Sequence, residues 1–189
     1  MRATHTADAA FQGFGYSNTL LNAGWHVTGI GGSDSHDPDR PSREAGAIGS
    51  PTTVVYMPEL SVHGLLAGVR SGRAFIDVEG TRNRLLDLSA RAGDRQAAMG
   101  GTLPVPAGET VRFFAELNGV PSGIIQVIVD GRVAPSLETK FDAAHPIALA
   151  PWHSDGGAHW IRVDVRDADG RLLLVGNPIY IVFAKGLKR

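Results

Sequence analysis

Two residues of the kinds that bind metal ions stand two positions apart near the start of the chain, directly after a pair of glycines. Asp34 and His36 lie within residues 31–37, GGSDSHD. A hard carboxylate together with an imidazole suits Zn, Mn or Fe. On an extended backbone the side chains of residues i and i+2 point the same way, so the two groups could converge on one ion.

A turn is the competing interpretation of the same residues. Ser and Asp that follow paired glycines often hydrogen-bond to their own backbone, and His36 could then be a surface residue. Asp-x-His is a short motif with many accidental matches, so the spacing alone favours the turn. Asp37 and Asp39 are expected to be loop residues in either case.

The elements around this motif must hold it in place. Residues 26–30 are expected to form a buried strand that Gly31 and Gly32 end. In α/β barrels the carboxyl ends of the strands carry the chemistry. A short helix is expected before this strand, and strands are expected at residues 52–57 and 73–78. Together with a helix between them, this order is α/β in character.

The clearest helix covers residues 61–71. Val62, Leu65, Leu66 and Val69 recur at i, i+3, i+4 and i+7, which predicts one apolar stripe. Ser61 is the natural N-cap. The two glycines inside the helix, at positions 64 and 68, either weaken it or permit close packing on a sheet.

The pattern changes near residue 82, after which short period-two segments are separated by turn sequences. We expect strands at residues 85–90, 110–117, 124–129, 148–152, 160–165 and 178–183. Asp130-Gly131 and Asp169-Gly170 are typical hairpin turns. The alternation in residues 160–166 predicts apolar side chains inside and charged ones outside. These features favour an immunoglobulin-like antiparallel β-sandwich over residues 83–189, preceded by a separate α/β unit over residues 1–82.

Composition removes several classes of function. The chain has no Cys, so disulfides and thiolate metal sites are excluded, and any metal must be held by His, Asp or Glu. The net charge is −1 with no basic stripe, so nucleic acid is not an expected partner. No apolar run approaches the roughly 20 residues of a membrane span. Without a signal peptide the default compartment is cytoplasmic, or secreted or periplasmic if a leader has been lost.

Other candidate residues give weaker patterns. His153 and His159 flank Asp155 and could form a second metal site, but a solvated loop between strands is favoured because no regular element fixes their spacing. His26 could support a metal ligand or be a hydrogen-bonded core residue, and His63 is expected at the surface. The serine-hydrolase, dinucleotide and P-loop spacings are all missing, so no catalytic or cofactor-binding side chain is assigned.

Residues 31–37 resemble the last metal-binding motif of the PHP (polymerase and histidinol phosphatase) family of metal-dependent hydrolases. The likeness continues through residues 49–56, 60–61 and 70–76, which are similar to the segments that follow that motif in the CehA/McbA-like branch. The tail also resembles that branch, ending in residues 177–180, NPIY. In all, the resemblance covers about residues 15–183.

The resemblance implies the last strands and helix of a distorted (β/α)7 barrel with a di- or trinuclear Zn, Mn or Fe centre. In such enzymes a metal-activated hydroxide attacks a small-molecule phosphate or other ester. Asp34 and His36 match two ligands of that centre, and this match favours the ligand interpretation over the turn.

The departures from the family pattern limit what this chain is expected to do alone. The family opens with a His-x-His motif that this chain lacks, and upstream of Gly31 the sequence offers only His5, His26 and Asp8 as metal-binding types. A barrel needs roughly 200 residues, and about 65 precede the sandwich. The chain therefore resembles the C-terminal portion of such a hydrolase, and by itself it is expected to be inactive and can lack the metal. It could self-associate or pair with a missing barrel portion; the alternative is a non-catalytic β-sandwich binding or association module.

Overall fold

The computed structural model describes residues 13–41, 46–142 and 147–184, which form mainly antiparallel β-strands with two α-helices. The helices are α1 (Gly13–Asn22) and α2 (Val62–Arg70), with a 3-10 turn at Pro135–Leu137. The strands are β1 (Thr52–Val55), β2 (Ala74–Asp77), β3 (Leu85–Ala92), β4 (Arg95–Ala98), β5 (Thr102–Val105), β6 (Thr110–Asn118), β7 (Ser122–Val129), β8 (Arg132–Val133), β9 (Thr139–Asp142), β10 (Ile147–Ala148), β11 (Trp152–His153), β12 (His159–Arg166), β13 (Leu172–Gly176) and β14 (Ile179–Phe183).

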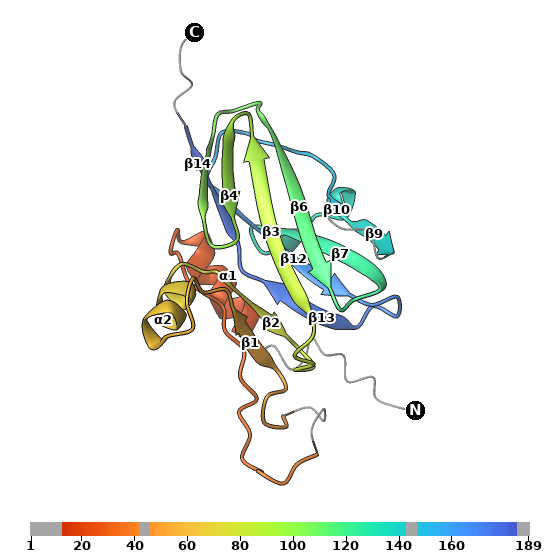
Figure 1. Cartoon of the computed structure of the whole chain (residues 1–189). Helices are drawn as coiled ribbons and strands as arrows, with labels where there is room; N and C mark the ends of the chain where they lie inside the picture. The colour runs from red at the N-terminus through yellow and green to blue at the C-terminus, as the bar shows by residue number, and fades with distance from the viewer. Residues whose placement is uncertain (1–12, 42–45, 143–146, 185–189) are drawn as a thin grey trace.

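The strands make two sheets that face each other, as the predicted β-sandwich requires (Figure 1). The larger sheet runs β1-β2-β13-β12-β14-β5, with β7 beside β12 and β8 and β9 beside β7. The smaller sheet runs β10-β6-β3-β4, with β11 also on β6. Strands β14 and β5 pair in parallel, and the other described strand pairs are antiparallel. The immunoglobulin-like topology and the barrel remain predictions.

The main core lies between the two sheets. On β3 and β6 buried and more exposed residues alternate, so Leu86, Leu88 and Phe113 point inward with almost no exposed surface. Ile161 and Val163 of β12 meet them from the larger sheet. The period-two patterns that predicted strands here were therefore sound, because one face of each strand is buried.

The strand predictions need correction at residues 148–152 and at β13, and β4, β5, β8 and β9 were likewise not predicted. In place of one strand at residues 148–152 there are two short strands, β10 and β11, each pairing with β6, and residues 149–151 between them are in no strand. Strand β13 was not predicted at all. Its residues, Leu172 to Gly176, are all buried, so its sequence is a continuous apolar run without alternation. A strand covered on both faces loses the period-two signal.

The hairpin turn at Asp130-Gly131 is confirmed. It joins β7 to β8, and Val129 pairs with Arg132. Both turn residues have positive φ, +50° for Asp130 and +84° for Gly131. Two successive positive φ angles define the type I′ turn that the Asp-Gly sequence favours.

The N-terminal part of the chain shares a sheet with the sandwich. Strands β1 and β2 pair with each other, and β2 pairs with β13 from Leu174 to Gly176. Helix α1 covers the outer face of the larger sheet, where Leu21 packs with Ile128, Trp160 and Tyr180. The boundary between residues 82 and 83 stays a prediction, and β2 is the strand that connects the two predicted parts.

Covering that outer face buries charges that the alternation of β12 placed in solvent. Arg162 and Asp164 are 7% and 4% exposed. They pair with each other, with Nε 3.0 Å from Oδ1, and Arg162 also donates to the Asn18 side chain of α1. The alternation was correct, but "charged outside" was wrong because α1 lies over these residues.

Candidate functional site: the segment of residues 26–36

The segment before the Asp34–His36 motif is extended but is not a strand of either sheet, contrary to the expectation for residues 26–30. Side chains take the place of a partner strand. Gly29 donates to Asn177 Oδ1 (2.6 Å), and Asn177 Nδ2 donates to the Gly29 carbonyl (3.0 Å). At Gly31 the hydroxyl of Thr53 both accepts from the backbone nitrogen and donates to the carbonyl, each at 2.8 Å. The segment is thus attached along one edge.

Residues 177–180, the NPIY tail quoted above, supply the main attachments. Asn177 is buried, and its Nδ2 also donates to the Ala74 carbonyl of β2 (2.7 Å). Tyr180 donates to the Val27 carbonyl (3.3 Å), and its ring stacks on His26 with centroids 3.7 Å apart. Burial raises the pKa of the Tyr180 hydroxyl, so it remains a donor at neutral pH. His26 therefore lies on an aromatic ring rather than in the core.

Gly31 is required by packing. A Cβ at this position would lie 2.7 Å from Ile76 Cγ2 on β2, closer than real Cβ atoms come to a neighbour. At Gly32 an added Cβ would meet nothing within 4 Å. The first glycine of the motif lets the segment approach β2, and the second has no such role.

Asp34 and His36 themselves are exposed. Asp34 has a φ of +50°, so the extended backbone ends there and the i, i+2 argument for parallel side chains does not apply to this pair. Ser35 Oγ donates to the Asp37 carbonyl and the Asp39 nitrogen donates to Asp37 Oδ1, as in a loop. Figure 1 shows this loop, in orange, projecting past the ends of β1 and β2.

Within the described residues no group of three or more His, Asp or Glu side chains could hold a metal. His5 and Asp8 lie outside the described residues. A catalytic metal usually has three protein ligands and an open position. Asp34 and His36 could supply two of them, so the metal assignment stays a prediction.

A histidine outside the motif is bonded on both sides. His159 Nδ1 lies 2.6 Å from Asp130 Oδ2, and its Nε2 lies 2.8 Å from Asp155 Oδ1. Burial lowers the pKa of His159, but the two carboxylates outweigh it and raise that pKa above 6.5. The hydrogen bond from His159 lowers the pKa of Asp155. An imidazole with both nitrogens engaged is neither an available base nor a metal ligand.

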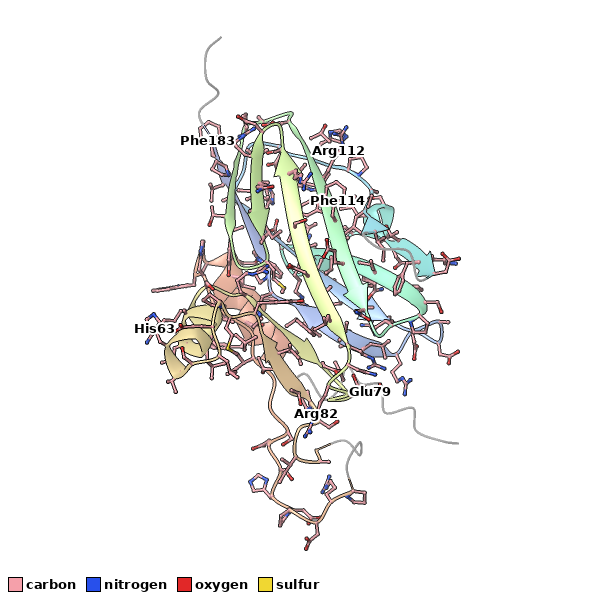
Figure 2. All side chains as sticks on the ribbon, in the orientation of Figure 1. His63, Glu79, Arg82, Arg112, Phe114 and Phe183 are labelled. Atoms are coloured by element: carbon pink, nitrogen blue, oxygen red, sulfur yellow. The ribbon has the colours of Figure 1, made fainter. Side chains whose placement is uncertain are left out.

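Of these two carboxylates the sequence pattern pointed to Asp155, four positions before His159, but not to Asp130, which lies 29 positions away in a predicted hairpin turn. The suggested partner, His153, lies instead 3.1 Å from Thr110 Oγ1 through its Nδ1. His63 is exposed as expected and projects from α2 (Figure 2). Neither α1 nor α2, nor any other helix among the described residues, has the length and apolarity of a membrane span.

Comparisons with known proteins add no further constraint. No protein-family model, curated protein or solved structure matches this chain.

Proposed function

We propose that this chain is the C-terminal portion of a PHP-type metal-dependent hydrolase that acts on a small-molecule phosphate or related ester. Asp34 and His36 would be two ligands of its metal centre. The proposal rests on the resemblance of residues 31–37 and their flanking segments to that family. The chain alone is expected to be inactive, because the other ligands are missing from the part of the chain that the structure describes.

One observation carries the proposal beyond the motif: the extended segment before it has an open edge. The backbone groups of Gly29 and Gly31 are bonded by Asn177 and Thr53. Those of the alternate residues, Thr28 and Ile30, make no hydrogen bond to any described residue. Alternate residues of an extended chain direct their N–H and C=O groups to opposite sides. A segment bonded along one edge and open along the other is what an incomplete barrel would leave.

The neighbouring helix is also uncovered on its apolar side. Helix α2 packs through its buried glycines, and a Cβ at Gly68 would lie 2.5 Å from the Tyr56 carbonyl oxygen. Its apolar stripe faces outward, with Val62 75%, Leu65 40% and Leu66 44% exposed. The Thr28 hydroxyl donates to the Val69 carbonyl, so the open edge and this helix are adjacent. Both would be covered by a missing barrel portion or by a second copy of the chain.

The expected metal is Zn, Mn or Fe, which would activate water and stabilise negative charge developing on the ester. Asp34 and His36 would hold the ion from an exposed loop, where a substrate could reach it. Their side chains have no hydrogen-bond partner among the described residues, so ligation would break no bond that the fold uses.

The test compares this chain with the natural gene product, whose mass is measured first. Metal content and hydrolysis of p-nitrophenyl phosphate, bis-p-nitrophenyl phosphate and p-nitrophenyl acetate are measured for both. In a longer gene product, Asp34→Ala and His36→Ala should each remove bound metal and lower the activity by about a hundredfold or more. The loop control Asp39→Ala should leave the metal content and the activity unchanged. A metal-loaded, active protein unaffected by Asp34→Ala would contradict the proposal.

The second candidate is a non-catalytic association module, which the exposed apolar stripe of α2 favours. Light scattering separates the two. If the gene product is no longer than this chain, binds no metal and self-associates, and if Leu65→Asp with Leu66→Asp disperses it, the association role replaces the enzyme. A monomer that binds no partner would count against that role.

A further inference from the structure

A pocket of about 390 Å³ lies on the outer face of the larger sheet, where the end of α1 meets β12 and β14. Its apolar walls include Leu21, Ala158 and Val182, and its polar groups include Asn22, His26 and Asp130. This size and this mixture of apolar wall with a few convergent polar groups are typical of small-molecule sites. The pocket uses neither Asp34 nor His36.

The polar side chains of the pocket are held in place by hydrogen bonds that use only part of their donors and acceptors. Asn22 Oδ1 accepts from Trp160 Nε1 (2.7 Å), which leaves the two Nδ2 hydrogens without a described partner. Asp130 Oδ1 accepts from the Trp160 backbone nitrogen (3.0 Å), and Asp130 Oδ2 faces the His159 ring. Each of these two oxygens retains a further lone pair.

His26 completes the set. Its ring stacks on Tyr180 with an angle of 5° between the planes, so one face is covered and the ring orientation is fixed. Its nitrogens make no hydrogen bond to a described residue, and a neutral imidazole offers one donor and one acceptor. Asn22 and His26 therefore present hydrogen-bond donors to the pocket, and Asp130 and His26 present acceptors. The contacts described above hold these side chains in place before a ligand binds.

We infer that this pocket binds a single pyranose sugar unit. Hydroxyl groups both donate and accept, so a ring of them matches the mixed set of groups, whereas its C–H face fits the apolar wall. An anion would find no Lys or Arg in the lining. A cation would find one carboxylate, which is already paired with the His159 ring. The inference does not depend on the proposed hydrolase.

The experiment is an NMR titration of the ¹⁵N-labelled chain with glucose, galactose, mannose and N-acetylglucosamine, and with inorganic phosphate and ethanolamine as charged probes. At least one sugar should give saturable shifts of the Trp160 indole and Asn22 side-chain amide signals. Neither charged probe should do so. If phosphate or ethanolamine gives saturable shifts, or if none of the four sugars does, the inference is overturned.

Three variants test the assigned groups. His26→Phe keeps the stacked ring but removes both nitrogens, and Asn22→Asp keeps the acceptor for Trp160 but removes the donors. Each should weaken sugar binding about tenfold. His63→Phe, on exposed α2, makes the same chemical change away from the pocket and should leave binding unchanged. Affinity within twofold of the parent in a folded His26→Phe variant would overturn the inference, whether or not Asn22→Asp folds.

Discussion

The core between the two sheets and the surface of the N-terminal part of the chain differ in how far their apolar side chains are buried. Between the two sheets, large side chains such as Phe113, Leu86 and Leu88 have almost no exposed surface. The N-terminal region instead carries eight of the eleven exposed large apolar side chains among the described residues. They are Tyr16, Trp25, Ile30, Ile48, Leu60, Val62, Leu65 and Leu66.

The two regions also differ in how they are held. Strands β3 and β6 pair along seven successive residues, from Leu85 opposite Asn118 to Arg91 opposite Arg112. Residues 27–31 are attached mainly by the side chains of Asn177, Thr53 and Tyr180. Strands β3 and β6 bond each other's backbone groups along their length, whereas residues 27–31 are bonded by side chains along one edge and leave the other edge open.

Leu88→Ala against Leu66→Ala tests the contrast in burial with one chemical change. Leu88 is fully buried between the sheets, so its truncation should cost about 2–5 kcal/mol of unfolding free energy. Leu66 is 44% exposed on α2, so its truncation should cost about 0.5 kcal/mol of unfolding free energy or less in this chain. Urea unfolding measures both. Equal losses would mean that α2 is covered in solution.

Gly68→Ala tests how α2 is attached. The added Cβ would lie 2.5 Å from both the Tyr56 oxygen and Val55 Cγ1, so we expect a loss of about 1–3 kcal/mol despite the better helix propensity of Ala. Gly15→Ala on α1 is the control, since its Cβ would meet nothing within 4 Å. It should be neutral or stabilise by up to about 1 kcal/mol. Thermal melts should show a lower Tm for Gly68→Ala and an unchanged or higher Tm for Gly15→Ala.

Asn177→Ala tests the attachment of the segment before the motif. It removes the donor and acceptor that satisfy Gly29, so we expect about 1–3 kcal/mol of local destabilisation. Hydrogen exchange should then accelerate at the backbone N–H groups of Gly29 and Gly31, which are hydrogen-bonded in this segment, and stay unchanged in β6. Tyr180→Phe removes only the bond to the Val27 carbonyl and should have a smaller effect, about 0.5–1.5 kcal/mol. Uniform acceleration over the whole chain would show that the segment is not a separate unit.

The smallest effect is expected from the His159 triad and is a pH dependence. The folded-state pKa of His159 is raised, so its bonds stabilise the fold fully below about pH 6.5 and less as pH rises through the raised pKa. The pKa of Asp155 is lowered, so its contribution is present above about pH 3.8 and is lost as pH falls through the lowered value.

The difference in stability between the parent chain and His159→Gln should therefore be largest between about pH 4 and 6.5, with the parent more stable. This difference should shrink towards pH 9. Urea midpoints across this range measure it. A difference that grows with rising pH would contradict the assigned direction.

Several local features were predictable because neighbouring residues encode them. Alternation located β3 and β6, Asp130-Gly131 specified its turn, and Ser61 caps α2 by accepting from the Gly64 nitrogen. The apolar stripe located α2 as well, and of the two alternatives left open for Gly64 and Gly68 the structure shows the close packing. A stripe shows that a helix has two faces, and only the tertiary packing shows which one is covered.

The sequence by itself determined the largely antiparallel strands, the helix at residues 62–70 and the position of the Asp34–His36 motif. The tertiary structure decided which distant groups meet: Asn177 with Gly29, Asp130 with His159, and Asn18 with Arg162. Local hydrogen-bonding and burial patterns act over a few residues and can be recognised along the chain. Asp130 and His159 are 29 positions apart in the sequence, Gly29 and Asn177 are 148 apart, and Asn18 and Arg162 are 144 apart. Such contacts leave no spacing pattern in the sequence. The first arises when β7 pairs with β12, and the other two arise when α1 and residues 26–31 settle on the outer face of the larger sheet.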